Sequence, residues 1–216
     1  MTRVLVVDDQ ALFRAGLVAL LAAAPGVEVV GEACDGGRAV ELAASLCPDV
    51  ILMDIRMPGV SGIAALERIV AAGSSARVLM LTTFDLDEYV YDALRAGACG
   101  FVLKEAEPAR LLSAIATVAA GDMLFGPTIT RRLVESFLRR DVVAPVGLDG
   151  LTDREREVLR LVGTGITNAA IATRLTVTEG TVKTHLNRVM TKLRLSSRAQ
   201  AVVMAYESGL VTPSAV

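Results

Sequence analysis

Histidine and cysteine, which bind most transition metals in proteins, are scarce in this sequence. His185 is the only histidine among 216 residues, so a catalytic or metal-binding role for it lacks a histidine partner, and we expect it to be structural or to contact a phosphate. The three cysteines, Cys34, Cys47 and Cys99, are scattered and have no Cys-x-x-Cys spacing. We interpret them as reduced core residues of a cytosolic protein.

Long apolar runs and an amino-terminal leader pattern are also lacking. No apolar stretch approaches the roughly 18 to 20 residues that a membrane helix needs. The chain starts with Met-Thr-Arg, and the short run that follows, residues 4–8, ends in an acid, which is unlike a signal peptide. The turn after this run also lacks the glycine spacing of a dinucleotide site. The sequence therefore predicts a cytoplasmic protein with no membrane partner.

The composition and the distribution of charge indicate two folded units. Hydrophobic residues make up 53% of the chain and charged residues 21%, so the chain can bury hydrophobic cores. Residues 1–125 contain 9 basic and 16 acidic side chains, a net charge of −7, whereas residues 126–216 contain 13 and 8, a net charge of +5. This asymmetry suggests separate roles and makes nucleic acid a candidate partner of the basic half.

The first half alternates short apolar runs with longer helical patterns. The apolar runs are rich in Val, Ile and Leu without clean alternation, as expected of strands that are buried on both faces. We predict strands at residues 4–7, 27–33, 50–53, 78–82 and 101–103. We predict helices near residues 11–23, 37–46, 62–72, 87–96 and 108–120. Repeated strand–helix units predict a parallel sheet with helices on both faces.

Polar side chains follow four of the predicted strands. Asp8 and Asp9 end the first strand, Asp54 the third, Thr82 the fourth and Lys104 the fifth. Ligands of such sheets bind beyond the carboxyl ends of the strands, where all these side chains would meet. For each acid taken alone, capping of the next helix is the better explanation. Acids, a hydroxyl and a lysine at four strand ends together favour a functional site.

The chemistry of these groups points to phosphoryl transfer. Carboxylates held close together repel one another and require a cation, and Mg²⁺ prefers oxygen ligands while leaving positions open for phosphate oxygens. A carboxylate beside that ion can act as a nucleophile toward phosphorus. A lysine and a hydroxyl can then bind the oxygens of the transferred group.

The second half reads as a helical module that binds DNA. Thr152 and Glu155 form a capping-box pattern at the start of a first helix. A short helix near residues 168–175, a three-residue turn and a longer helix to about residue 193 form a helix-turn-helix pattern, and a fourth helix spans about residues 197–208. Between residues 174 and 198 the only acid is Glu179 among six basic residues. A basic amphipathic helix alone is usually a solvated face, but the preceding helix and turn favour DNA.

The first half resembles the receiver domains of bacterial response regulators. The matching motifs lie in order over residues 1–122: VLVVDDQ (4–10), DVILMDIRMPGVSG (49–62), LTTF (81–84) and GACGFVLK (97–104). The resemblance implies a five-stranded parallel sheet of flavodoxin-like order 2-1-3-4-5. It implies Asp54 as the phospho-acceptor and Mg²⁺ as the cofactor. The remaining implied site residues are Asp8, Asp9 and the backbone carbonyl of Arg56 as metal ligands, with Thr82, Lys104 and Phe101 as phosphoryl-binding and switch residues.

Two positions depart from the usual receiver pattern. Phe101 stands where many receivers have tyrosine, so any part of the switch that depends on a hydroxyl there is absent. Glu105 follows Lys104 where many receivers have proline, so a cis-proline after Lys104 is excluded.

The second half resembles the LuxR-type helix-turn-helix. The matching segments are LTDREREVL (151–159), GITN (165–168), IA (171–172), EGTVKTH (179–185), KL (192–193) and RAQAV (198–202). By this resemblance Lys183, Thr184 and Asn187 are candidate base contacts. The candidate phosphate contacts are Thr178, Thr181, Arg188 and Lys192. The family usually has a basic residue and then Glu after Asn168, but this chain has two alanines, so a contact at that helix start is missing.

Together the two resemblances identify a response regulator of the NarL/FixJ type rather than an enzyme. We expect a receiver domain at 1–122, a linker with a helix at 123–147, near 131–140, and a four-helix DNA-binding domain at 148–216. A sensor histidine kinase would phosphorylate Asp54, and phosphorylation would favour a homodimer that binds double-stranded promoter DNA. The alternatives are a regulator that works without phosphorylation and a phosphatase that turns over an aspartyl phosphate.

Overall fold

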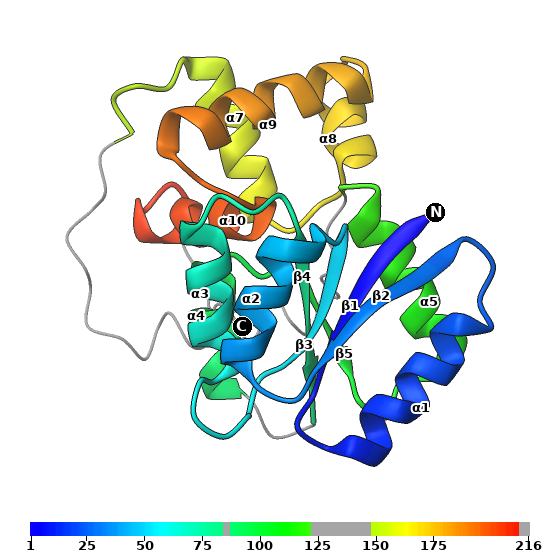
Figure 1. The fold of residues 1–216 in the computed structure, drawn as a ribbon. Helices are drawn as coiled ribbons and strands as arrows, with labels where there is room; N and C mark the ends of the chain where they lie inside the picture. The colour runs from blue at the N-terminus through cyan, green and yellow to red at the C-terminus, as the bar shows by residue number, and fades with distance from the viewer. Residues whose placement is uncertain (84–86, 122–147, 212–216) are drawn as a thin grey trace. The chain divides into compact units, whose positions relative to one another are not determined.

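The computed structural model describes residues 1–83, 87–121 and 148–211 (Figure 1). The chain divides into two compact units, Met1–Leu124 and Phe125–Val216. The predicted helix near residues 131–140 and the motif residue Phe84 lie outside the described residues.

The first unit is built on a five-stranded parallel sheet. Its strand order is β2-β1-β3-β4-β5, which confirms the predicted topology. All five predicted strands are present, and their ends differ from the prediction by two residues or fewer. The strands are β1 (Thr2–Val7), β2 (Val27–Ala33), β3 (Val50–Asp54), β4 (Arg77–Thr82) and β5 (Gly100–Leu103).

Helices cover both faces of this sheet, as predicted (Figure 1). One face is covered by α1 (Ala11–Ala22) and α5 (Pro108–Ala119). The other face is covered by α2 (Gly36–Leu46), α3 (Gly62–Ala71) and α4 (Asp87–Ala96). Pro108 is the first residue of α5, where its fixed φ suits a helix and its missing N–H leaves no bond unmade.

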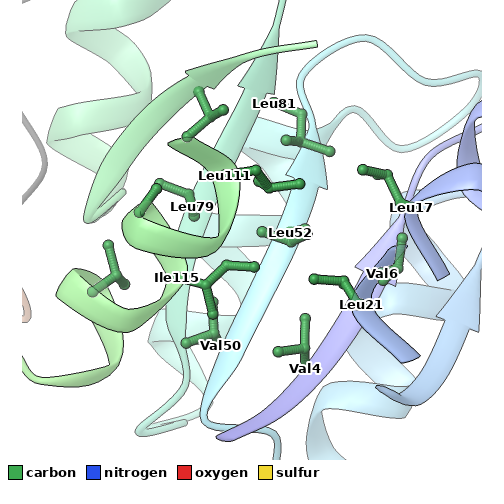
Figure 2. Packing of buried hydrophobic residues seen from close by; sticks show 13 residues of the cluster. Val4, Val6, Leu17, Leu21, Val50, Leu52, Leu79, Leu81, Leu111 and Ile115 are labelled. Carbon is green, nitrogen blue, oxygen red and sulfur yellow. The ribbon is translucent and has the colours of Figure 1, made fainter. Parts of the chain in front are cut away.

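The core beneath α1 and α5 explains why the strands are so rich in aliphatic residues. Figure 2 shows Leu17 and Leu21 of α1 and Leu111 and Ile115 of α5 packed toward the sheet. They meet every second residue of the central strands, since side chains alternate between the faces of a sheet. These strand residues are Val4, Val6, Val50, Leu52, Leu79 and Leu81. The central strands are thereby fixed, and with them the position of every side chain at their carboxyl ends.

The second unit contains four helices within its described residues. They are α7 (Asp153–Gly163), α8 (Asn168–Leu175), α9 (Glu179–Leu193) and α10 (Arg198–Glu207). The predicted capping box is confirmed at the start of α7, where Thr152 Oγ1 accepts from the backbone N–H of Glu155 and Glu155 accepts from that of Thr152. The α8–turn–α9 segment confirms the helix-turn-helix prediction.

The prediction that the cysteines are core residues is wrong for two of the three. Cys34 and Cys47 are exposed, and Cys99 is half-buried, although all three are free thiols. Cys34 follows the edge strand β2, and Cys47 ends α2 in the left-handed conformation with φ of 44°. Residues at such ends of an edge strand or a helix lie outside the packed layers, whatever the polarity of the residues beside them. No helix among the described residues has the length and apolar character needed to cross a membrane.

Candidate functional sites: an acidic pocket and a basic helix

Three carboxylates meet at the carboxyl edge of the sheet. Asp8 and Asp9 follow β1 and Asp54 ends the adjacent β3, and one carboxylate oxygen of each lies within 4.8 Å of the others. Asp8 is 0% exposed and Asp54 5%, whereas Asp9 is exposed. The predicted convergence of these strand ends is thus observed. Buried like charges at this spacing are stable only beside positive charge.

Lys104 supplies part of that positive charge. Its Nζ lies 2.7 Å from Asp8 Oδ2 and 2.9 Å from Asp54 Oδ2, and its side chain is only 9% exposed. Three carboxylates and one ammonium leave a formal charge of −2 in the pocket. One divalent cation would balance this remaining charge. The ligand atoms that the three carboxylates offer are oxygens, which suit a hard ion such as Mg²⁺.

Burial and pairing shift the ionisation of the central pair. Burial raises the pKa of Asp54 above its ordinary value, and this outweighs the hydrogen bond and charge of Lys104, which lower it. Burial lowers the pKa of Lys104, but its bonds to Asp8 and Asp54 outweigh burial, so the net shift is upward. Lys104 therefore stays protonated as long as its carboxylate partners are ionised.

Thr82 lies at the end of β4, next to the acidic pocket, and is buried. The backbone N–H of Lys104 donates to the carbonyl of Thr82 at 2.7 Å, so the ends of β4 and β5 are joined. The Thr82 hydroxyl itself donates to the Thr83 carbonyl at 3.0 Å. To bind a group on Asp54 the hydroxyl has to leave that carbonyl.

The β3–α3 loop carries Arg56 and folds tightly against the strand end. The backbone N–H of Gly62 donates to the Ile55 carbonyl at 3.0 Å. A Cβ at position 62 would lie 1.9 Å from the Asp54 carbonyl oxygen, so only glycine permits this approach. Arg56 is exposed, and beside it lies a hollow of about 410 Å³ lined also by Asp9, Pro58 and Tyr89. This hollow leaves open space beside the carboxylates.

Phe101 lies on β5 opposite Met80 of β4 and is buried. The ring is therefore already packed inside the unit in this structure.

Two residues of α1 also contact the site, and the sequence patterns did not single them out. Arg14 donates to the Asp8 carbonyl at 2.6 Å, and the ring of Phe13 lies 5.0 Å from Lys104 Nζ. In the helical pattern Phe13 reads as an ordinary core position. The sequence feature that could have identified Phe13 and Arg14 is their position in the first turn of the helix that follows Asp8 and Asp9.

The second site is the outward face of α9. The buried residues of α9 are Val182, Leu186 and Val189, and the opposite face is mostly exposed. The outward residues include most of the predicted DNA contacts: Thr178, Lys183, Thr184, Asn187, Arg188 and Lys192 are exposed, and Thr181 is half-buried. A face of this composition can place donors and positive charge against phosphates and base edges.

Lys192 differs from Lys183, which pairs with Glu179 on the same helix, because its ion-pair partner lies on another helix. Its Nζ lies 2.6 Å from Oε2 of Glu155, a side chain on α7 that is 4% exposed. The Lys192 hydrogen bond and then the Thr152 backbone N–H lower the pKa of Glu155 to about 2. Lys192 thus joins α9 to α7, whatever contact it also makes outside the unit.

The start of α8 is held although two alanines follow Asn168. Thr167 Oγ1 accepts from the backbone N–H of Ala170 at 3.2 Å. Arg198 of α10 donates to the side chain of Asn168 and to the Ile166 carbonyl. These bonds compensate for the contact that the two alanines cannot make.

His185 lies on α9 and is half-buried, and its buried Nδ1 has no hydrogen-bond partner among the described residues. The role expected of His185, structural or as a phosphate contact, stays a prediction.

Two family models match the chain, and together they span most of it. The response regulator receiver domain matches residues 4–116, and the luxR family of bacterial regulatory proteins matches residues 149–205.

Several curated proteins and solved structures are similar over nearly the whole chain. The nitrate/nitrite response regulator protein NarL of Escherichia coli is 38% identical over 94% of both chains. The transcriptional regulatory protein LiaR of Bacillus subtilis is 40% identical over 98% of this chain and 100% of its own. The crystal structure of the response regulator ChrA of a heme-sensing two-component system has a TM-score of 0.53 and 32% identity, covering 97% of this chain and 98% of that one.

Proposed function

Because the chain belongs to the NarL/LuxR family of two-component response regulators, which are transcription factors and not enzymes, we propose that phosphorylation of Asp54 switches its binding to promoter DNA. A sensor histidine kinase would supply the phosphoryl group. The observation that carries this proposal is the pocket itself, in which Asp8, Asp9 and Asp54 cluster and Lys104 contacts two of them.

The residues of the pocket fit Mg²⁺. Asp8, Asp9, Asp54 and the Arg56 carbonyl would hold the ion, and all of them are oxygen donors. When bound, the ion would neutralise charge on the phosphoryl oxygens as they approach the carboxylates. The net charge of the pocket supports this assignment, because a single lysine leaves two of the three carboxylate charges unbalanced.

The remaining side chains suit transfer of a phosphoryl group. A carboxylate oxygen of Asp54 attacks phosphorus, the bond from phosphorus to the histidine nitrogen of the donor breaks, and an acyl phosphate forms on Asp54. The Lys104 ammonium then exchanges its bond to Asp54 for one to a phosphoryl oxygen. The Thr82 hydroxyl leaves the Thr83 carbonyl and binds a second phosphoryl oxygen.

Movement of Thr82 provides the link from the pocket to the rest of the unit. Thr82 ends β4, and Lys104 directly follows the neighbouring strand β5, which contains Phe101. A phosphoryl group that draws Thr82 inward favours one of two preexisting packings of Phe101 and α4. We propose that this packing favours a homodimer.

For DNA, we propose that α9 enters the major groove. Lys183, Thr184 and Asn187 would contact base edges, and Thr178, Thr181, Arg188 and Lys192 would contact phosphates. A homodimer would place two copies of α9 on paired half-sites. We assign residues 1–122 to the receiver, 123–147 to the linker and 148–216 to the DNA-binding domain.

Intact-protein mass spectrometry tests the acceptor. The full chain is incubated with acetyl phosphate and Mg²⁺, and in parallel with EDTA in place of Mg²⁺. We expect the mass of one phosphoryl group to be added with Mg²⁺ only, and none to be added to Asp54→Asn. Asp49→Asn is the matched control, since Asp49 is an exposed acid outside the pocket, and it should be phosphorylated as the wild type is. Equal phosphorylation of Asp54→Asn and wild type would refute the proposal.

A further inference from the structure

The ammonium group of Lys104 contacts a third group besides the two carboxylates. Its Nζ lies 5.0 Å from the centroid of the Phe13 ring, within the range of cation–π attraction. Phe13 is in the first turn of α1, and Lys104 follows β5, which β3 and β4 separate from β1 in the sheet. The contact therefore joins residues from opposite sides of the acidic pocket.

Phe13 is itself held in place. Its side chain packs against the apolar cluster beneath α1 and α5. The next residue, Arg14, donates to the Asp8 carbonyl at 2.6 Å and lies 3.4 Å from the Glu32 carboxylate. The first turn of α1 is thus tied to the end of β1, so the ring has a defined position relative to Asp8.

The position of the Lys104 ammonium needs such a restraint once a cation is bound in the pocket. Lysine carries its ammonium on a flexible stem, unlike the rigid fork of arginine. A divalent ion at Asp8 and Asp54 takes up the charge that attracts the ammonium and also repels the ammonium directly. The face of the Phe13 ring keeps its attraction for the ammonium, because the ring carries no ligand atom for the ion.

We propose that Phe13 is a positioning residue, whose ring keeps the Lys104 ammonium where it meets an oxygen of the phosphoryl group on Asp54. This inference rests on the proposed function. The competing explanation is that Phe13 only fills space. Leucine fills similar space without a π face, whereas tyrosine keeps the ring, and a hollow of about 480 Å³ beside Phe13 and Lys104 leaves room for its hydroxyl.

The first measurement is the affinity of the full chain for beryllofluoride, a mimic of the phosphoryl group, in saturating Mg²⁺, followed by ¹⁹F NMR. We expect Phe13→Leu to weaken binding by about fivefold, the scale of a partly desolvated cation–π contact. Phe13→Tyr should recover most of that loss. Leu20→Val is the control, since Leu20 lines the same hollow from α1, and it should bind as the wild type does. A tyrosine variant as weak as the leucine variant would overturn the proposal.

The second measurement asks whether Phe13 acts through Lys104. It is made without a phosphoryl group or its mimic. Urea unfolding in Mg²⁺ compares wild type, Phe13→Leu, Lys104→Met and the double variant. We expect the Phe13→Leu loss to be smaller when Lys104 is Met, because only the loss of packing against the apolar cluster then remains, whereas additive losses would overturn the contact. The two measurements separate the failures: a wild type that binds no beryllofluoride refutes the proposed function, and additive unfolding refutes the positioning role.

Discussion

Lys192 and Glu155 form an ion pair of 2.6 Å that joins the helix predicted to enter DNA to the first helix of its unit. Glu155 is buried and also accepts from the backbone N–H of Thr152, whereas Lys192 is exposed on α9. The carboxylate thus accepts hydrogen bonds from two donors, one of which is a side chain 37 residues away in the sequence. A single basic residue of α9 therefore contributes to the fold of the unit as well as to its positive face.

Replacing Lys192 should cost stability, and replacing Lys183 should not. Lys192→Met leaves the buried Glu155 carboxylate without its cation, and we expect the free energy of unfolding to fall by about 2 kcal/mol. Lys183 forms only an exposed pair with Glu179, at 3.4 Å, so Lys183→Met should change stability by about 0.5 kcal/mol or less. Urea unfolding measures both. If the free energy of unfolding fell in Lys192→Met by no more than the small change expected of Lys183→Met, Lys192 would have no structural role.

The same two variants should rank differently in DNA binding. Lys192→Met removes a proposed phosphate contact, so it should reduce the slope of log affinity against log salt by about one. Lys183→Met removes a proposed base contact, so it should instead relax discrimination between operator and random DNA. Fluorescence anisotropy over a range of salt concentrations checks this. An unchanged salt slope in Lys192→Met would argue against α9 as the DNA-binding face.

The stability of the second unit should depend on acid pH through Glu155. Its pKa is about 2 in the folded protein against an ordinary value of 4.5, so folding favours the ionised form. The resulting stabilisation is complete above pH 4.5 and is lost as pH falls from 4.5 toward 2. Unfolding of the Glu155→Gln protein should lack this part of the pH dependence. A wild-type profile with the same slope as the variant between these pH values would contradict the shift.

Gly62→Ala should damage the acceptor loop. The added Cβ would lie 1.9 Å from the Asp54 carbonyl oxygen, so the β3–α3 loop has to move, and we expect a loss of about 2 to 3 kcal/mol. Gly16→Ala is the control, because an alanine Cβ there has nothing within 4 Å and lies inside α1, where alanine stabilises by roughly 0.5 to 1 kcal/mol. Thermal unfolding should therefore move in opposite directions. A neutral Gly62→Ala would show that the loop adjusts freely.

Thr82→Ala should separate phosphorylation from its consequence. The variant keeps Asp54, Asp8, Asp9 and Lys104, so it should still gain one phosphoryl group. Without the hydroxyl, the gain in DNA affinity on phosphorylation should drop from about tenfold or more to less than about twofold. Thr83→Ala, at an exposed neighbour whose carbonyl and not its side chain is used, is the control. A full response in Thr82→Ala would remove Thr82 from the switch.

The sequence predicted those parts of the molecule that depend on local pattern and topology. Aliphatic strands that are buried on both faces and alternate with helical patterns specify the sheet, and the sheet brings Asp8, Asp54 and Lys104 together whatever lies between them. The capping box at Thr152 and Glu155 is likewise a local signal. Both predictions succeed because the information lies within a few residues of each element.

Contacts between side chains far apart in the sequence were not predictable in the same way. Nothing near Lys192 indicates that its partner is Glu155, and the helical pattern of α1 does not distinguish Phe13 from its core neighbours. The exposure of Cys34 and Cys47 depends on where the edge strand and the end of α2 lie in three dimensions. The hydrogen bond of the Thr82 hydroxyl to Thr83 depends on a side-chain torsion that no sequence pattern encodes.

The most direct test of the central claim, that the Asp54 site controls assembly, is the solution mass of the full chain by light scattering. The protein is measured with Mg²⁺ alone and with Mg²⁺ and beryllofluoride, together with Asp54→Asn under both conditions. We predict that the wild type changes from a monomer of 22.7 kDa to twice that mass with beryllofluoride and that Asp54→Asn does not respond. A wild-type mass that beryllofluoride leaves unchanged, or an equal response from Asp54→Asn, would contradict the claim.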